Sequence, residues 1–290
     1  MVKKSFFTII IVSYNAGDKL FYTLESVKKQ SFSDYRIIIK DGLSTDGSMD
    51  KLKSEYDLTG KISLVESCDN GIYHAMNIAT SYLNEKENKG ILEDPSYIFF
   101  LNCGDLFADE NVLKNVHDSI VSENAKGGTT LPAIFYGDIF DNMTKGRMAS
   151  NPKIDDFACY RHLPSHQACF YDERLVFKYP FDIVYKVRAD YDHFLKCYYL
   201  EKARTVYIPI VIANYEGGGF SDRNKKISEQ ERKEIIKRYL PPSKVMKYDF
   251  IRIVTLARFR TFLANNKITA SLYNSLKSAA YKMVSRKGEK

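Results

Sequence analysis

Four apolar runs near the start of the chain each end at a small polar residue or a carboxylate. The runs occupy residues 6–13, 35–40, 61–67 and 97–102 and are rich in Ile, Val, Phe and Tyr, which is the composition of buried strands. They lead respectively into Ser13-Tyr14-Asn15, Asp41-Gly42, Cys68-Asp69-Asn70-Gly71 and Asn102-Cys103-Gly104-Asp105. Parallel strands would bring these four ends to one edge of a sheet, and glycine lets a ligand approach the backbone closely.

Helical periodicity separates these runs. Leu20, Leu24 and Val27 recur at helical spacing, and the segment 71–83 shows the same pattern. A fifth strand is expected at 133–138. This alternation predicts an α/β fold with a Rossmann-like, doubly wound and mostly parallel sheet that carries helices on both faces.

The polar strand ends allow two interpretations. Asx-Gly pairs are common turn formers, and any one of the four could be only a turn. Four in succession on one edge favour a ligand site instead, because doubly wound sheets bind ligands outside the carboxyl ends of their strands.

The carboxylates at this edge indicate a metal-bridged anion. The sequence has no Walker-type G-x-x-x-x-G-K-[ST] motif, so a lysine and glycine cradle for phosphates is not indicated. Carboxylates would repel a diphosphate unless Mg²⁺ or Mn²⁺ stood between them, since both ions accept carboxylate and phosphate oxygens together. Asp105 is the expected metal ligand. Its alternative role is the N-cap of a helix that starts near Asp109.

Composition points to a reduced, cytoplasmic environment without a membrane span. The chain has 290 residues, and no apolar run approaches the roughly 20 residues that cross a bilayer. Its five cysteines are scattered and form no C-x-x-C pair, which argues against a disulfide framework or a thiolate zinc site.

Several segments taken together resemble family 2 glycosyltransferases of the GT-A fold, in particular bacterial enzymes of polysaccharide and O-antigen assembly. They are the first two strands with their following loops, "DNGIYHAMN", "FLNCGD", "SHQACF" and "RADYDHFLK", and the resemblance covers about residues 6–221 in order. It implies a nucleotide-diphosphate sugar donor, expected to be a UDP-sugar, a divalent metal (Mn²⁺ or Mg²⁺), and transfer with inversion at the anomeric carbon.

The resemblance also assigns donor-binding roles. Ser13, Tyr14 and Asn15 match positions that line the nucleotide pocket, Asp41 matches the carboxylate that pairs with the base, and Asp69 matches a second base-side residue. In the same way, Asp105 corresponds to the last acid of the metal-binding D-x-D motif. The first acid of that motif is replaced here by Asn102, which removes negative charge from the metal site.

The resemblance names Asp190 as the base that takes the proton from the acceptor hydroxyl. Asp192 is a weaker candidate, since two residues further along a helix it would point away by roughly 200°. Either aspartate could instead cap the helix that follows. His166 and Gln167 match residues near the donor sugar and the acceptor, and a purely structural role is the alternative.

The segment 215–224, "YEGGGFSDRN", contains three consecutive glycines. Similar enzymes carry a glycine-rich lid here, from which Ser221 or Arg223 could reach the diphosphate. A plain flexible linker is the alternative reading.

The excess positive charge lies at the C-terminus. Residues 244–290 hold eleven Lys or Arg against two acids, a net charge of +9, whereas the rest of the chain carries −2. Two amphipathic helices are expected, at 244–263 and about 268–284, and they suit either an anionic membrane surface or packing on the body or in a homodimer. Nucleic-acid binding is not expected, because no nucleic-acid-binding motif accompanies the charge.

We therefore predict a GT-A catalytic domain at 1–222 and a basic, mainly helical extension at 223–290. The predicted activity moves a sugar to a hydroxyl of a bacterial surface glycan or a polyprenyl-diphosphate-linked acceptor, at the inner face of the cytoplasmic membrane or in the cytoplasm. One alternative is a non-catalytic nucleotide-sugar-binding or scaffold protein with the same fold, and another is a nucleotidyltransferase.

Overall fold

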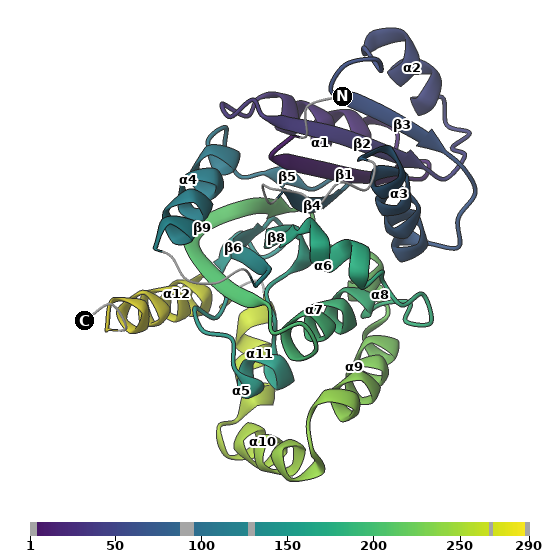
Figure 1. Ribbon diagram of the computed structural model, residues 1–290. Helices are drawn as coiled ribbons and strands as arrows, with labels where there is room; N and C mark the ends of the chain where they lie inside the picture. Colours follow the sequence, from purple (N-terminus) through teal and green to yellow (C-terminus); the bar gives the residue numbers. More distant parts are fainter. Residues whose placement is uncertain (1–4, 88–95, 127–130, 267–268, 288–290) are drawn as a thin grey trace.

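The computed structural model describes residues 5–87, 96–126, 131–266 and 269–287. Within these residues the strands form a nine-stranded sheet in the order β3-β2-β1-β4-β8-β6-β9-β5, with β7 paired to β6 (Figure 1). The strands are β1 (Phe7–Ser13), β2 (Tyr35–Asp41), β3 (Ile62–Glu66), β4 (Tyr97–Asn102), β5 (Leu106–Phe107), β6 (Ala133–Asp141), β7 (Gly146–Met148), β8 (Cys169–Asp172) and β9 (Arg204–Tyr215).

Helices cover both faces of the sheet. They are α1 (Asp18–Lys28), α2 (Ser48–Glu55), α3 (Ile72–Glu87), α4 (Val112–Ala125), α5 (Asp156–Arg161), the 3₁₀ helix η1 (His166–Ala168), α6 (Glu173–Lys178), α7 (Ala189–Tyr199), α8 (Phe220–Arg223), α9 (Lys225–Tyr239), α10 (Pro242–Val254), α11 (Ala257–Asn265) and α12 (Ala270–Lys287). This arrangement confirms the predicted α/β class and the five predicted strands.

The two faces of the sheet belong to two separate hydrophobic cores. In β1, Ile9 and Ile11 pack in the core that contains α1 and α4, whereas Ile10 packs in the core that contains α3 and α7. Successive side chains of a strand point to opposite faces, so a run of consecutive apolar residues is what a strand covered on both sides requires. Burial of each such side chain contributes about 1.5–3 kcal/mol of transfer free energy.

The register of the parallel strands aligns their carboxyl ends. Ser13 of β1 lies opposite Asp41 of β2, and on its other side Val12 lies opposite Asn102 of β4. The polar residues that follow these three strands therefore emerge along one edge of the sheet, as the sequence predicted.

Beyond β4 the sheet is mixed. Strand β8 is antiparallel to both β4 and β6, whereas β9 runs parallel to β6 and antiparallel to β5. The polar edge is thus formed by the parallel half, and the chain after β8 returns across it.

The C-terminal region differs from the prediction in its first helix. The expected single helix at 244–263 is wrong: Leu256 adopts a left-handed conformation (φ 48°) that separates α10 from α11. The expected boundary between residues 222 and 223 falls inside α8. Position 268, the expected start of the last helix, lies outside the described residues, and α12 begins at Ala270. Among the described residues, none of the helices has the length and apolarity needed to span a membrane.

Candidate functional site

The loops after β1 and β2 interlock through short polar side chains. Asp41 is fully buried, and its carboxylate accepts hydrogen bonds from the backbone N–H (2.7 Å) and the hydroxyl (2.6 Å) of Ser44. Asn15 joins the same network, since its N–H donates to Ser44 Oγ (2.8 Å) and its Oδ1 accepts from the N–H of Thr45 (2.8 Å). The side chains of Asn15 and Asp41 thus fix the shape of this edge before any ligand binds.

Tyr14 and Asp69 meet over Gly42. A Cβ atom at position 42 would lie 3.0 Å from Tyr14 Cδ2 and 3.1 Å from Asp69 Oδ2, so glycine allows this close approach. The Tyr14 side chain is 68% exposed and leaves an aromatic surface open to solvent. Asp69 pairs with Lys40, a fully buried lysine at the end of β2 that sequence reasoning did not single out.

Asp105 lies buried between two segments that are far apart in the sequence. Its Oδ1 accepts the backbone N–H of Glu216 (2.9 Å), and its Oδ2 accepts the side-chain amide of Gln167 (3.1 Å). Burial raises the pKa of this carboxyl, although both hydrogen bonds oppose the shift. The alternative role as a helix N-cap is wrong, because the N-cap of α4 is Asn111.

Glu216 occupies the space that a side chain at position 104 would fill. Gly104 has a φ of 100°, and a Cβ atom there would lie 2.3 Å from Glu216 Oε2. The Glu216 carboxylate also forms an ion pair with Lys19 of α1 (2.7 Å). A second acid therefore stands beside Asp105, contributed by the glycine-rich segment. The sequence carried no signal for it, because Glu216 is far from the FLNCGD motif in the chain.

A hydrogen-bonded chain connects Asn102 to Asp190. His166 Nε2 lies 3.1 Å from Asn102 Nδ2, and His166 Nδ1 lies 3.3 Å from Asp190 Oδ2. A neutral imidazole with its proton on Nδ1 satisfies both contacts, since it donates to the carboxylate and accepts from the amide. On its other side, Asp190 Oδ1 accepts the backbone N–H of Tyr191 (2.8 Å) and lies 3.0 Å from the hydroxyl oxygen of Tyr73, whose single proton is shared between this carboxylate and the carbonyl oxygen of Val187 (2.8 Å).

Asp190 keeps its negative charge through these contacts. Burial by itself would raise the pKa of Asp190, but the hydrogen bond from His166, the charge of Arg188 and the backbone N–H of Tyr191 lower it below the ordinary value. The carboxylate is therefore ionised at neutral pH and able to accept a proton.

The segment before Asp190 is held by a carboxylate from α9. Glu231 accepts backbone N–H groups from Lys186 (2.8 Å), Val187 (3.0 Å) and Arg188 (2.9 Å). Asp192 has a different environment: it is fully buried and bonds Lys196 (2.7 Å) and Tyr239 (2.9 Å). This environment agrees with the prediction that Asp192 is a weaker candidate than Asp190 for the base.

Asp190, His166, Gln167 and Ser221 line one cavity of about 290 Å³. The glycines that precede Ser221 have positive φ at Gly217 (82°) and Gly218 (68°), a conformation that L residues rarely adopt. Arg223 is exposed and does not line this cavity. His74 accepts the N–H of Asn70 (3.0 Å), two residues before α3 begins.

The residues near Asp105 fit a divalent cation whose remaining ligands are oxygens of a diphosphate. Asn102 Oδ1 is buried and accepts no hydrogen bond from the described residues, and the oxygens of Asp105 and Glu216 are nearby. Within the described ranges no group of three or more His, Cys, Asp or Glu could hold a metal alone. Mg²⁺-type sites commonly use one or two carboxylates and complete the shell with substrate phosphates and water.

Sequence comparison places this chain in a known family. The model of glycosyl transferase family 2 matches residues 8–177, more than half of the chain. A "PGL/p-HBAD biosynthesis glycosyltransferase" of Mycobacterium bovis (strain BCG / Pasteur 1173P2) is 27% identical over 220 residues, which cover 74% of this chain and 79% of that protein.

Solved structures with the same fold extend over most of the chain. A mannosyltransferase from Pyrobaculum calidifontis in complex with GDP-Man and Mn²⁺ has a TM-score of 0.60 at 13% identity, covering 99% of this chain and 80% of the other. S. aureus TarS 1–349 in complex with UDP has a TM-score of 0.59 at 16% identity, covering 90% and 75%. The chain has the GT-A fold and belongs to glycosyl transferase family 2, and it is a glycosyltransferase.

Proposed function

We propose that the protein transfers a sugar from a UDP-sugar to an acceptor hydroxyl, with inversion at the anomeric carbon. The hydrogen-bonded arrangement around His166 and Gln167 carries this proposal. His166 contacts Asp190, and the adjacent Gln167 contacts Asp105, so an acceptor base and the carboxylate beside the diphosphate lie on either side of one short helix. A displacement reaction needs the base at the attacking hydroxyl and the carboxylate at the leaving diphosphate.

The donor nucleotide is assigned to the edge formed by β1 and β2. In this proposal the exposed ring of Tyr14 stacks against the base, and Ser13 and Asn15 shape the pocket. Asp41 and Asp69 lie on the base side, where Asp41 acts by holding the loop at Ser44. The structure of TarS in complex with UDP supports the choice of UDP as nucleotide.

Asp190 is proposed to accept the proton of the attacking hydroxyl. The acceptor oxygen forms a bond to the anomeric carbon while the bond from that carbon to the donor diphosphate breaks, and the proton passes to Asp190 Oδ2 or Oδ1. His166 Nδ1 and the Tyr73 hydroxyl hold the carboxylate in place during this step.

Asp105, with Glu216 and Asn102 beside it, is proposed to hold Mn²⁺ or Mg²⁺ together with the donor diphosphate. When bound, the ion neutralises negative charge on the leaving nucleoside diphosphate. The structure of the P. calidifontis mannosyltransferase in complex with GDP-Man and Mn²⁺ supports the assignment of a metal. The glycine-rich segment that carries Ser221 is proposed to act as a lid over the diphosphate. Arg223 would reach the diphosphate only after this segment moves.

The test is sugar-nucleotide turnover with Mn²⁺ for the wild type and for Asp190→Asn, with donor binding measured in parallel. Loss of a general base typically lowers the rate by 10²–10⁴-fold. We expect such a loss in kcat with donor affinity unchanged. Donor binding by the wild type without turnover on any acceptor would instead support the scaffold alternative. Release of diphosphate in place of UDP would indicate a nucleotidyltransferase.

We propose that the C-terminal helices bind an anionic membrane surface, where a polyprenyl-linked or other surface-glycan acceptor would be presented. Several large apolar side chains of this region are more than half exposed: Met246, Phe250, Ile253, Val254, Leu256, Phe259, Phe262, Leu272 and Leu276. The net charge of +9 complements anionic lipid, and each basic residue near such a surface contributes about 1 kcal/mol. Apolar side chains surrounded by cations are the composition of interfacial helices.

Sedimentation with vesicles tests this location. We expect the wild type to sediment with phosphatidylglycerol vesicles at low salt and not with phosphatidylcholine, and the double variant Phe250→Glu/Ile253→Glu to remain in the supernatant. Val121→Glu, which changes an exposed apolar residue of α4, is the matched control. If the double variant instead converts a dimer to a monomer while vesicle binding is unchanged, the face is a homodimer interface and the membrane proposal fails.

A further inference from the structure

A second cavity, of about 300 Å³, lies between the catalytic body and the C-terminal helices. Its walls come from α5, α9, α10, α11 and α12 and from the residue that precedes α7. Six cationic side chains line it: Arg161, Arg188, Arg232, Arg252, Arg260 and Lys277. One carboxylate, Glu229, accompanies them. The volume is at the lower end of the range of small-molecule sites.

Among the side chains that line this cavity, cations outnumber carboxylates. The ion pair of Glu229 is with Arg232, through two hydrogen bonds of 2.9 Å. In the described part of the chain, the guanidinium groups of Arg161 and Arg260 have no carboxylate within ion-pair distance, and the buried Nε of Arg260 has no hydrogen-bond partner. Like charges gathered away from bulk water repel one another, so an anion entering the cavity would be attracted by all of them.

Lys277 is the one lysine among these cations, and burial is the main cause of its lowered pKa. Burial and the charge of Arg161 lower the pKa of Lys277 to about 8. Its ammonium donates to the carbonyl oxygen of Ala149 (2.9 Å). Arginine forks match phosphate oxygens in a bidentate geometry, and an ammonium adds a further donor, so this set of side chains suits a phosphate or diphosphate group.

The basic cavity adjoins the cavity that contains Asp190. Arg161, Arg188 and Arg232 line both of them. An acceptor could therefore place a hydroxyl beside Asp190 and an anionic group among the arginines at the same time. The metal-bridged donor diphosphate belongs to the edge at Asp105, so this anion is a different one.

We propose that the cavity lined by Arg161, Arg252 and Arg260 binds a phosphate or diphosphate group of the acceptor. This inference rests on the proposed function, because it identifies the anion as part of the molecule whose hydroxyl Asp190 deprotonates. The cavity adjoins the helices that carry the exposed apolar side chains, which is where the headgroup of a membrane-anchored acceptor would enter.

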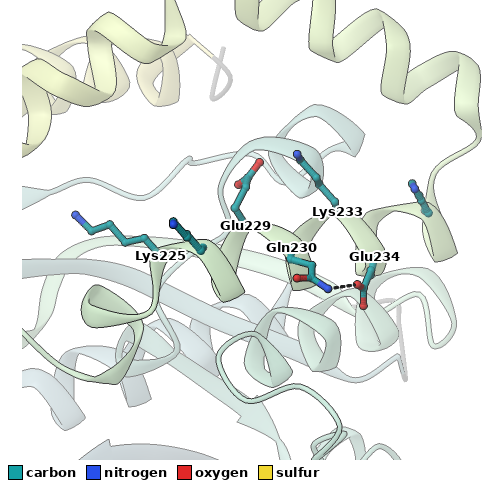
Figure 2. A pocket seen from close by; sticks show the side chains of 7 residues that line it. Lys225, Glu229, Gln230, Lys233 and Glu234 are labelled. Carbon is teal, nitrogen blue, oxygen red and sulfur yellow. Dashed lines mark hydrogen bonds between the residues drawn. The ribbon is translucent and has the colours of Figure 1, made fainter.

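A separate hollow on the outer face of α9 provides the control. Figure 2 shows Lys225, Glu229, Gln230, Lys233 and Glu234 along this helix, with the side-chain amide of Gln230 bonded to Glu234 (3.0 Å). Lys226 and Lys233 line this hollow and not the basic cavity. Their replacement removes the same number of positive charges, from positions on α9 that do not line the proposed site.

The experiment is calorimetric titration of the full chain with farnesyl diphosphate, inorganic diphosphate and farnesol, with saturating UDP present to fill the donor site. We expect both diphosphates to bind the wild type and farnesol not to bind. Arg161→Gln/Arg260→Gln should lower the affinity for both diphosphates by at least about tenfold, since charge-assisted hydrogen bonds to phosphate are lost. Lys226→Gln/Lys233→Gln should change the affinity for either diphosphate by less than about twofold.

The two diphosphates distinguish the sources of the anion. Tighter binding of farnesyl diphosphate assigns the site to a lipid-linked group, and equal binding assigns it to a phosphate on any soluble acceptor. Failure of the wild type to bind either diphosphate, or equal weakening in the control variant, would overturn the inference. If UDP itself does not bind, the proposed function fails; if UDP binds and the diphosphates do not, only the acceptor site fails.

Discussion

Asp190 shows how contacts between segments far apart in the sequence complete the site. The sequence identified this aspartate and His166, but not that the Tyr73 hydroxyl would bond the same carboxylate. Tyr73 lies more than a hundred positions earlier in the chain, and only the packing of α3 against the segment before α7 brings the two together. Glu216 was missed for the same reason: no local pattern links it to Gly104. The sequence predicted which polar residues lie at the ends of the strands, but it did not predict contacts between distant segments.

Tyr73→Phe removes one of the two hydrogen bonds to Asp190 Oδ1. A lost donor to the ionised form raises the pKa of Asp190, so the acidic limb of the pH profile of kcat/KM should move to higher pH, by up to roughly one unit. We expect kcat to fall by roughly three- to tenfold with donor affinity unchanged. Tyr22→Phe, at an exposed tyrosine of α1, should leave the profile unmoved. A profile that is identical in both variants would show that Tyr73 does not act on the base.

At the scale of elements, the strands were predictable and the ends of the later helices were not. Apolar-rich runs of six to eight residues bounded by turn residues favour buried strands, and β1 to β4 match their predicted positions closely. The break between α10 and α11 depends on the left-handed backbone of Leu256, for which the sequence offers neither glycine nor asparagine. The role of α9 was also hidden, because it depends on Glu231 reaching the segment before α7.

Glu231→Ala tests whether α9 positions the base. The variant leaves three backbone N–H groups without their acceptor, and unpaired buried donors cost about 1–3 kcal/mol each when water cannot replace the partner. We expect the free energy of unfolding to drop by about 2–4 kcal/mol and kcat to fall more than donor affinity. Urea unfolding and steady-state kinetics measure both. Glu234→Ala, on the exposed face of the same helix, should change neither, and similar losses in the two variants would contradict a positioning role.

The whole molecule separates charge between its two ends. The sheet and its flanking helices carry the polar edge, whereas the basic residues gather in α10 to α12, of which α10 and α11 lie in the lower part of Figure 1 and α12 at its left. Composition revealed this asymmetry, but not that cations from five helices would surround one cavity. The mixed order of β8, β6, β9 and β5 was likewise unpredictable, since antiparallel pairing after a long excursion leaves no periodic signal in the sequence.

Global stability is expected to decrease in mild acid because of His193. This histidine of α7 is fully buried, with Nδ1 2.6 Å from the carbonyl oxygen of Tyr179, and burial lowers its pKa to about 4 from 6.5. Below pH 6.5 this histidine binds a proton in the unfolded chain but stays neutral in the folded protein. The contribution of neutral His193 to the free energy of unfolding is therefore complete above pH 6.5 and is lost as the pH falls toward 4. Between pH 7 and pH 5 this amounts to about 2 kcal/mol. His193→Asn keeps a donor near Tyr179 but cannot titrate, so urea unfolding should show a flatter pH dependence in this variant. An unchanged slope would assign the acid sensitivity to other groups.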